Sequence, residues 1–293
     1  LFRSTTGQVQ AMTTDQLVAL SASQVASMET TDVAAMTTDQ LVALTSGQVA
    51  ALTTQQFSHL TTEQVAALTT DQLVKVTTKD IAALTTDQVR AMTTEQLGAL
   101  LTSQVTALKT SHISALTSDQ MAGFGATQVA VFTVDQAKAL GSDQITGLST
   151  TQVAAISNKD LVSMSNTQLN MFSEAQIAAL GNGQVSALKP SQMASLSVDL
   201  FTALTTAQMP ALTTAQAANL HTRQIAAMGS DQLAALTTAD LAAFTSTQIR
   251  SLTADQVPLL STNQIEGMQR GQFSSLTSEQ LASLTTTQIA AIE

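Results

Sequence analysis

The apolar and polar positions of this chain recur with a period of eight residues. We number the places of this octad one to eight along Thr61 to Leu68, Thr-Thr-Glu-Gln-Val-Ala-Ala-Leu, so that place four falls at every residue number divisible by eight. From Gln8 to Gln288 there are 36 octads without an insertion or deletion, and 30 of them carry Gln at place four. Place five is always apolar, and place eight is always large and apolar. Because a fixed short period is typical of stacked repeats, we expect one uninterrupted array over residues 1–293.

Each octad reads as the start of a short helix. Thr61 is placed to be the N-cap and Gln64 the N3 residue of a capping box, in which each side chain binds the backbone N–H of the other residue. Leu60 and Val65 have the spacing of a hydrophobic staple, and Glu63 lies where a negative charge favours a helix N-terminus. Thr69 is the next N-cap, so one helix should end where the following one begins. The predicted capping residues include Thr61, Gln64, Thr37, Gln40, Thr85 and Gln88.

Places five and eight form the predicted core, because their i, i+3 spacing puts them on one face of a helix. Two apolar side chains are too few to order eight residues alone, so neighbouring octads must share a continuous interior. Small residues at place seven allow backbones to approach closely, and the charged residues found at place six indicate a solvent-facing position. The predicted core residues include Val65, Leu68, Leu73, Leu41 and Leu44.

We therefore predict an all-α solenoid, or superhelix, of about 36 eight-residue units, each one short capped helix. A continuous helix is disfavoured because an eight-residue period drifts by roughly 80° per octad at 3.6 residues per turn, which leaves no stable apolar seam for a long bundle. The other alternative is a β-solenoid, although its strands normally show period-two alternation.

Proline positions bear on the same prediction. Pro190 falls at place two, the first helical position, where its missing N–H costs nothing. Pro210 and Pro258 fall at place six, inside the expected helices, so we expect a local distortion at both.

Composition and charge exclude several partners. The net charge is −10, with 11 Lys and Arg in no basic cluster, so neither nucleic acid nor an anionic membrane surface is an expected partner. No apolar run reaches the roughly 18 residues of a membrane span, so we expect no membrane insertion. The chain has no Cys, which excludes disulfides and thiolate metal sites and fits either the cytosol or a cysteine-avoiding bacterial exterior.

Candidate chemistry is sparse. His59, His112 and His221 occupy three different places and have no second His or carboxylate at ligand spacing. The many Ser and Thr hydroxyls share one environment without an adjacent base, and the acidic residues form no calcium-binding loop. We expect no catalytic, cofactor-binding or metal-binding residue, and no enzyme.

A second hypothesis concerns the Thr-Thr pairs. Place two is Ser or Thr in 25 octads. If their hydroxyls align on one face, they form a regular ladder that could bind ice, a mineral or a glycan. The alternative is that place two is only a small polar residue at the start of each helix.

The octads Thr37 to Leu44 and Thr85 to Met92 resemble the TTxQ-type repeats of very large secreted or surface proteins of Proteobacteria, often described as adhesin or haem-utilisation proteins. The resemblance implies an extracellular, fibre-forming bacterial protein, and the scattered histidines do not support a haem site. We expect a structural protein, an extracellular or cell-surface stalk, spacer or self-assembling fibre subunit whose partner is itself, end to end or laterally. Neither end carries an atypical capping repeat, which predicts an excerpt of a longer array or a fibre subunit.

Overall fold

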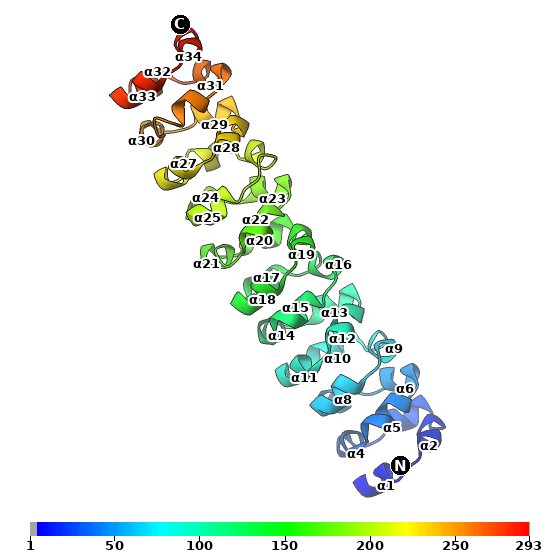
Figure 1. The fold of residues 1–293 in the computed structure, drawn as a ribbon. Helices are drawn as coiled ribbons and strands as arrows, with labels where there is room; N and C mark the ends of the chain where they lie inside the picture. The colour runs from blue at the N-terminus through cyan, green and yellow to red at the C-terminus, as the bar shows by residue number, and fades with distance from the viewer. Residues whose placement is uncertain (1–4, 293) are drawn as a thin grey trace. The chain divides into compact units, whose positions relative to one another are not determined.

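The computed structural model describes residues 5–292 as a succession of short helices, most of them four to six residues long. No strand occurs within that range, and Figure 1 shows one short coil after another along the chain. The all-α prediction of short repeated helices is confirmed, and the β-solenoid alternative is wrong.

The chain divides into two compact units, Leu1–Ile156 and Ser157–Glu293, which are described separately. The helices of the first unit are α1 (Thr6–Gln10), α2 (Thr14–Val18), α3 (Ala22–Ala26), α4 (Thr30–Ala35), α5 (Thr38–Ala43), α6 (Ser46–Ala50), α7 (Thr54–Ser58), α8 (Thr62–Ala67), α9 (Thr70–Leu73), α10 (Thr78–Ala83), α11 (Thr86–Ala91), α12 (Thr94–Ala99), α13 (Thr102–Ala107), α14 (Thr110–Ala115), α15 (Ser118–Ala122), α16 (Ala126–Val129), α17 (Val134–Lys138), α18 (Ser142–Gly147) and α19 (Thr150–Ala155).

The second unit contains α-helices and two 3₁₀ turns. They are α20 (Asn158–Ser163), α21 (Asn166–Leu169), α22 (Glu174–Ala178), α23 (Asn182–Ala187), α24 (Pro190–Ser195), α25 (Val198–Thr202), η1 (Met209–Ala211), α26 (Thr214–Ala217), α27 (Thr222–Ala227), α28 (Ser230–Ala235), α29 (Thr238–Ala242), α30 (Ser246–Arg250), η2 (Val257–Leu259), α31 (Thr262–Glu266), α32 (Arg270–Phe273), α33 (Ser278–Ser283) and α34 (Thr286–Ala290).

The reference octad shows why each helix is short. Thr61 has extended backbone angles (φ −71°, ψ 163°), and its hydroxyl accepts the Gln64 N–H at the start of α8. The helix ends when Leu68 returns to extended angles (φ −54°, ψ 133°). Thr69 then caps α9 in the same way. The chain does not run through Thr69 as one helix, because each apolar place eight leads directly into the next N-cap.

Helices pack between successive turns of each unit. In the first unit α8 contacts α5 and α11, which lie three octads before and after it, and in the second unit α27 contacts α30. Place seven of one helix rests on place two of the helix three octads earlier. At Gly147 the approach is so close that a Cβ atom would lie 2.3 Å from the Ser118 carbonyl oxygen. The small residues at place seven therefore permit the stacking distance.

The interior of the first unit is lined by places five and eight. Val65, Leu73 and Leu41 at place five are 0% exposed, and Leu68 and Leu44 at place eight are 3% exposed. Place six is exposed where it carries a long polar side chain, as at Gln10, Arg90 and Lys138 in this unit and Glu266 in the second. These burials follow the octad pattern because every octad repeats the same helix orientation toward the interior.

The prolines distort the repeat as the missing N–H requires. Pro190 is the first residue of α24. Pro210 and Pro258 lie within the 3₁₀ turns η1 and η2, where neighbouring octads form α-helices. A proline at place six cannot donate to the carbonyl four residues earlier, so the helix tightens into a turn stabilised by i, i+3 hydrogen bonds.

Candidate functional site

The glutamine at place four is the most highly connected side chain of the repeat. Gln64 Oε1 accepts the Thr61 N–H at 2.8 Å, and the Gln64 N–H donates to Thr61 Oγ1 at 3.1 Å. Its Nε2 amide donates to three carbonyl oxygens four octads earlier, those of Val33 (3.0 Å), Ala34 (3.3 Å) and Met36 (2.8 Å). We call this two-ended contact, Oε1 on its own N-cap and Nε2 on the carbonyls of places five and eight four octads earlier, a glutamine bridge.

The other predicted capping pairs take part in the same arrangement. Thr37 N–H donates to Gln40 Oε1 at 2.9 Å, and Gln40 Nε2 donates to the Val9 and Met12 carbonyls at 2.9 and 2.8 Å.

Thr85 N–H donates to Gln88 Oε1 at 2.7 Å, and Gln88 Nε2 donates to the Ser58 and Leu60 carbonyls at 3.1 and 2.7 Å. Every predicted capping residue thus lies at a helix start, and each of the three glutamines also joins two turns. Helices stack three octads apart, and the carbonyls that a bridge reaches end the helix directly before the stacked one, so both contacts indicate about three octads per turn.

Burial explains why an amide is needed here. Gln64 is 2% exposed, and the carbonyls that it reaches lie at a helix C-terminus, where Val33 also accepts the Met36 N–H but Ala34 and Met36 accept no backbone N–H of the described residues. A buried carbonyl without a donor is costly. Only an amide side chain supplies both an acceptor for the N-cap and two N–H donors for the preceding turn.

The donor half of this contact was absent from our sequence interpretation, although the sequence contains a signal for it. A capping box accepts Glu as readily as Gln at N3. Nevertheless, no octad has Glu at place four, whereas Glu occurs at place three in Glu63, Glu95 and Glu279. Because Glu lacks the N–H donors, its exclusion from place four points to a second, donating role.

The bridge does not depend on a hydroxyl at the N-cap. Where place one is Leu101, its N–H still donates to Gln104 Oε1 at 2.8 Å, and Gln104 Nε2 still reaches Leu73 and Val76, both at 2.8 Å. Gly125 donates to Gln128 in the same way, at 2.7 Å. Place one therefore tolerates substitution more readily than place four.

Aspartate at place four changes the contact. Asp80 is 5% exposed, and its Oδ2 accepts the Thr77 hydroxyl at 2.5 Å while Oδ1 accepts the Thr54 hydroxyl at 2.7 Å. Within the described chain no hydrogen bond joins Asp80 to the Val49 or Leu52 carbonyl, because a shorter carboxylate has no N–H to offer.

Asp240 also binds the hydroxyl of its own N-cap, Thr237. Burial raises the pKa of the Asp240 carboxyl, and the hydrogen bonds from Thr237 act in the opposite direction.

His112 reproduces the bridge with a ring. The Lys109 N–H donates to His112 Nδ1 at 3.2 Å, and Nε2 lies 2.9 Å from the Leu84 carbonyl, the place-eight carbonyl four octads earlier. These partners assign the neutral tautomer with hydrogen on Nε2. Burial lowers the pKa of His112, with a further lowering by Lys109 and an opposing effect of the Leu84 carbonyl. The ring therefore serves as an acceptor and donor in place of Gln.

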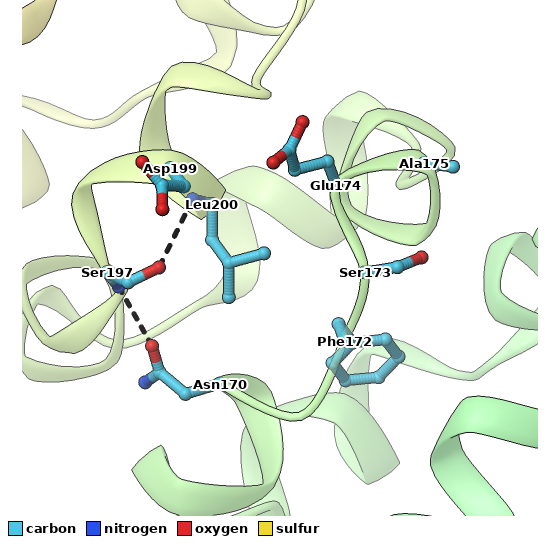
Figure 2. A pocket seen from close by; sticks show the side chains of 8 residues that line it. All are labelled: Asn170, Phe172, Ser173, Glu174, Ala175, Ser197, Asp199 and Leu200. Carbon is cyan, nitrogen blue, oxygen red and sulfur yellow. Dashed lines mark hydrogen bonds between the residues drawn. The ribbon is translucent and has the colours of Figure 1, made fainter.

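Leu200 replaces the glutamine in the second unit and lines a shallow groove of about 510 Å³ between α22 and α25 (Figure 2), similar to the groove of about 450 Å³ that Gln232 lines. Leucine cannot accept the Ser197 N–H. Asn170 takes over, accepting it on Oδ1 at 2.8 Å while its Nδ2 donates to the Ser195 carbonyl at 3.0 Å. The carboxylates of Glu174 and Asp199 lie at the rim of the groove.

The remaining candidate residues stay apart from one another. His59 is the C-cap of α7, and its Nδ1 lies 2.7 Å from the Gln55 carbonyl of that helix. His221 is the N-cap of α27. Over residues 5–292 no group of three or more His, Asp or Glu side chains is placed to hold a metal ion. In the same part of the chain no helix has the length and apolar character to cross a bilayer.

Five segments match the ALTTAQ repeat family: residues 25–62, 73–110, 153–190, 201–238 and 234–270. Together they cover more than half of the chain. The chain belongs to the ALTTAQ repeat family. No curated protein matched it.

An ALTTAQ segment is long enough to contain a bridge and both of its ends. In residues 73–110, Gln104 meets the Leu73 and Val76 carbonyls. In residues 25–62, Gln56 meets the Val25 and Met28 carbonyls at 3.1 and 2.7 Å. These ALTTAQ segments each contain one complete contact between turns, so the family assignment establishes a repeat region whose unit is larger than the octad.

Proposed function

We propose that this ALTTAQ repeat chain is a structural protein, an extracellular stalk, spacer or self-assembling fibre subunit of a bacterial surface or matrix, and not an enzyme. The observation that carries the proposal is the glutamine bridge. It joins each turn to the preceding one by the same buried contact, as at Gln64, Gln96 and Gln128 in the first unit. Because the same contact repeats in successive octads, it lengthens and stiffens the array. No single octad is set apart from the others by it.

Substitutions along the chain support this interpretation. Place one can be Thr61, Leu101 or Gly125, and the glutamine contact with its N–H persists. Where place four is Leu200, Asn170 takes over the N-cap contact. What recurs is a side chain that binds backbone groups of two turns and so holds the turns together, as a scaffold requires.

The proposed location outside a bacterial cell rests on the resemblance to TTxQ-type repeats of surface proteins. Antibody labelling of intact cells of the source bacterium, with permeabilised cells as the control, tests it. Labelling of intact cells, abolished by external protease, is the expected result. Labelling only after permeabilisation would contradict the location and leave the structural role untouched.

A binding surface of aligned Thr hydroxyls is the alternative function. Place-two residues lie against place seven of the helix three octads later, as Thr94 does against Gly123. This packing favours the structural role.

Electron microscopy of the purified chain, combined with small-angle X-ray scattering, tests the structural role. We expect elongated particles of uniform diameter, whose maximum dimension increases linearly in variants carrying additional copies of residues 61–92. Compact particles whose dimension grows only as the cube root of mass would overturn the proposal. Inhibition of ice recrystallisation, or glycan binding, by such compact particles would favour the hydroxyl surface instead.

A further inference from the structure

The helices of the second unit form three rows, because each helix stacks on the one three octads away. In one row α27 contacts α30, and α30 contacts α32. In the next row α28 contacts η2, and η2 contacts α33. The third row consists of α29, α31 and α34. A side chain on one row therefore recurs beside its equivalents on successive turns.

Charges are sorted by sign between two of these rows over residues 221–284. Each octad of the row α27, α30 and α32 has one arginine and no acidic residue, and we call it the arginine row. Each octad of the row α28, η2 and α33 has one acidic residue and no basic residue, and we call it the acidic row. All six side chains are exposed: Arg223, Arg250 and Arg270 in the arginine row, and Asp231, Asp255 and Glu279 in the acidic row.

The sorting is specific to these two rows and these three turns. In the third row Asp240 is buried, and Glu266 is the only exposed charge over the same turns. One turn before Arg223, the arginine row carries Asp199 instead. The second unit thus presents a matched pair of rows, three positive charges on one and three negative charges on the other.

These charges are not used within the chain. Among residues 5–292 the six side chains form no ion pair. The three guanidinium groups and the carboxylates of Asp255 and Glu279 have no hydrogen-bond partner in that range, and Asp231 accepts only the Ser230 hydroxyl, at 3.4 Å. Both rows can therefore meet an external surface of opposite charge.

We propose that the second unit binds the second unit of another copy of this chain side by side, with the arginine row of each copy on the acidic row of the other. Two copies related by a two-fold axis along the rows pair both rows at once, which is the closed arrangement most common among oligomers. The match extends over three turns because both rows belong to one superhelix and share its spacing between turns. The proposal deepens the proposed structural function and rests on it.

The charge pattern favours a second copy over an anionic polymer as the occupant. A polymer of one sign would be attracted by the arginine row and repelled by the acidic row in the neighbouring octads. A second copy uses both rows and offers one carboxylate for each guanidinium group, whose forked N–H donors match a carboxylate. Exposed ion pairs contribute little singly, so the contact should be reversible and weakened by salt.

Two variants reverse the charge of one row each. The arginine-row variant is Arg223→Glu, Arg250→Glu and Arg270→Glu. The acidic-row variant is Asp231→Lys, Asp255→Lys and Glu279→Lys. Their controls make the same changes of charge at exposed residues of the first unit. They are Lys75→Glu, Lys79→Glu and Arg90→Glu for the first variant, and Asp39→Lys, Glu63→Lys and Asp87→Lys for the second.

Sedimentation velocity of the full chain at increasing protein concentration measures the association. At about 0.1 M salt the unaltered chain and both controls should dimerise, and each row variant alone should stay monomeric, with its apparent Kd raised on the order of 100-fold or more. An equimolar mixture of the two row variants should dimerise again, because the new glutamates face the new lysines and the two unaltered rows also match. At about 1 M salt, where the Debye length is about 3 Å, the unaltered dimer should dissociate. Circular dichroism verifies that all variants keep the helical spectrum.

Four outcomes would overturn the pairing. They are an unaltered chain that stays monomeric at the lower salt, a dimer that persists at the higher salt, and a mixture of helical row variants that stays monomeric. The fourth is an acidic-row variant that dimerises while its first-unit control does not, which would assign the partner row to the first unit. Elongated monomers in electron micrographs would leave the spacer function standing while the pairing fails. Compact particles would remove the structural function itself.

Discussion

At the scale of single residues, the glutamine side chain carries the connection between turns. Its carbonyl oxygen accepts the N-cap N–H of its own helix, and its amide group donates to carbonyls of the preceding turn. In the interior octads these backbone groups cannot reach water. Removing the donor while keeping the acceptor therefore separates the two roles.

Gln96→Glu makes this separation in the first unit. The glutamate still accepts the Thr93 N–H but loses the donors to the Val65 and Leu68 carbonyls, now 2.9 and 2.7 Å away, and places a charge at a side chain that is 3% exposed. We expect the free energy of unfolding to fall by about 2–4 kcal/mol. Urea denaturation followed by circular dichroism measures the loss.

Gln24→Glu is the matched control for that substitution, because among residues 5–292 Gln24 accepts the Ser21 N–H on Oε1 and its Nε2 donates to no carbonyl. We expect a loss of less than about 0.5 kcal/mol for this variant. If both substitutions lowered the free energy of unfolding equally, the N-cap contact alone would account for the stabilisation that Gln provides.

His112 should make stability depend on pH. Its folded pKa is lowered by burial, so the unfolded chain binds more protons and stability is complete above the ordinary value of 6.5. As pH falls through 6.5 toward the lower folded pKa, protonation of Nδ1 removes the acceptor of the Lys109 N–H, at a cost of about 0.5–1.5 kcal/mol.

The His112→Gln variant restores the consensus and cannot titrate. Its Tm should therefore fall less between pH 8 and pH 5 than that of the unaltered chain. An identical fall in both proteins would assign the pH dependence to other groups.

At the scale of helices, the stacking distance is set by small residues at place seven. Gly147→Ala should be destabilising by about 1–3 kcal/mol, since the new Cβ would lie 2.3 Å from Ser118 backbone and the helices must separate. Thermal unfolding followed by circular dichroism measures the change.

Gly47→Ala is the control substitution within α6. Its Cβ would meet only Thr45 Oγ1, at 3.9 Å, so alanine should stabilise the helix by about 0.5–1 kcal/mol. Stabilisation at both positions would show that helix propensity, and not the approach of two turns, decides the outcome.

At the scale of the whole molecule, the array should tolerate changes in length only in steps of eight residues. Deletion of Thr61 to Leu68 removes one whole octad, so each later glutamine still faces carbonyls of places five and eight. Gln96, for example, would bind the Phe57 and Leu60 carbonyls in place of those of Val65 and Leu68. We expect the Tm to change by less than about 3 °C.

Deletion of Thr61 to Gln64 alone shifts the later octads by half a period. The bridges across the deletion then face the wrong places, and we expect the Tm to fall by roughly 10 °C or more. Calorimetry of the two deletions is the measurement. If both deletions are equally tolerated, the register is not set by the bridges.

Much of the local structure could be predicted from the sequence by itself. The N-cap at Thr61, the helix start, the core at Val65 and Leu68 and the restart at Thr69 all follow from interactions within about ten residues, whose geometry a regular pattern specifies. The distortion at Pro210 follows in the same way from its missing N–H.

Only the tertiary structure decided which octads meet. The amide of Gln64 binds carbonyls 28 to 31 residues earlier, and this separation depends on the angle between consecutive helices, which accumulates over about three octads. No pattern of eight residues specifies that angle. The sequence by itself determined that Gln recurs at place four; the superhelix supplied the reason, because it brings the C-terminal carbonyls of an earlier helix against each bridging glutamine.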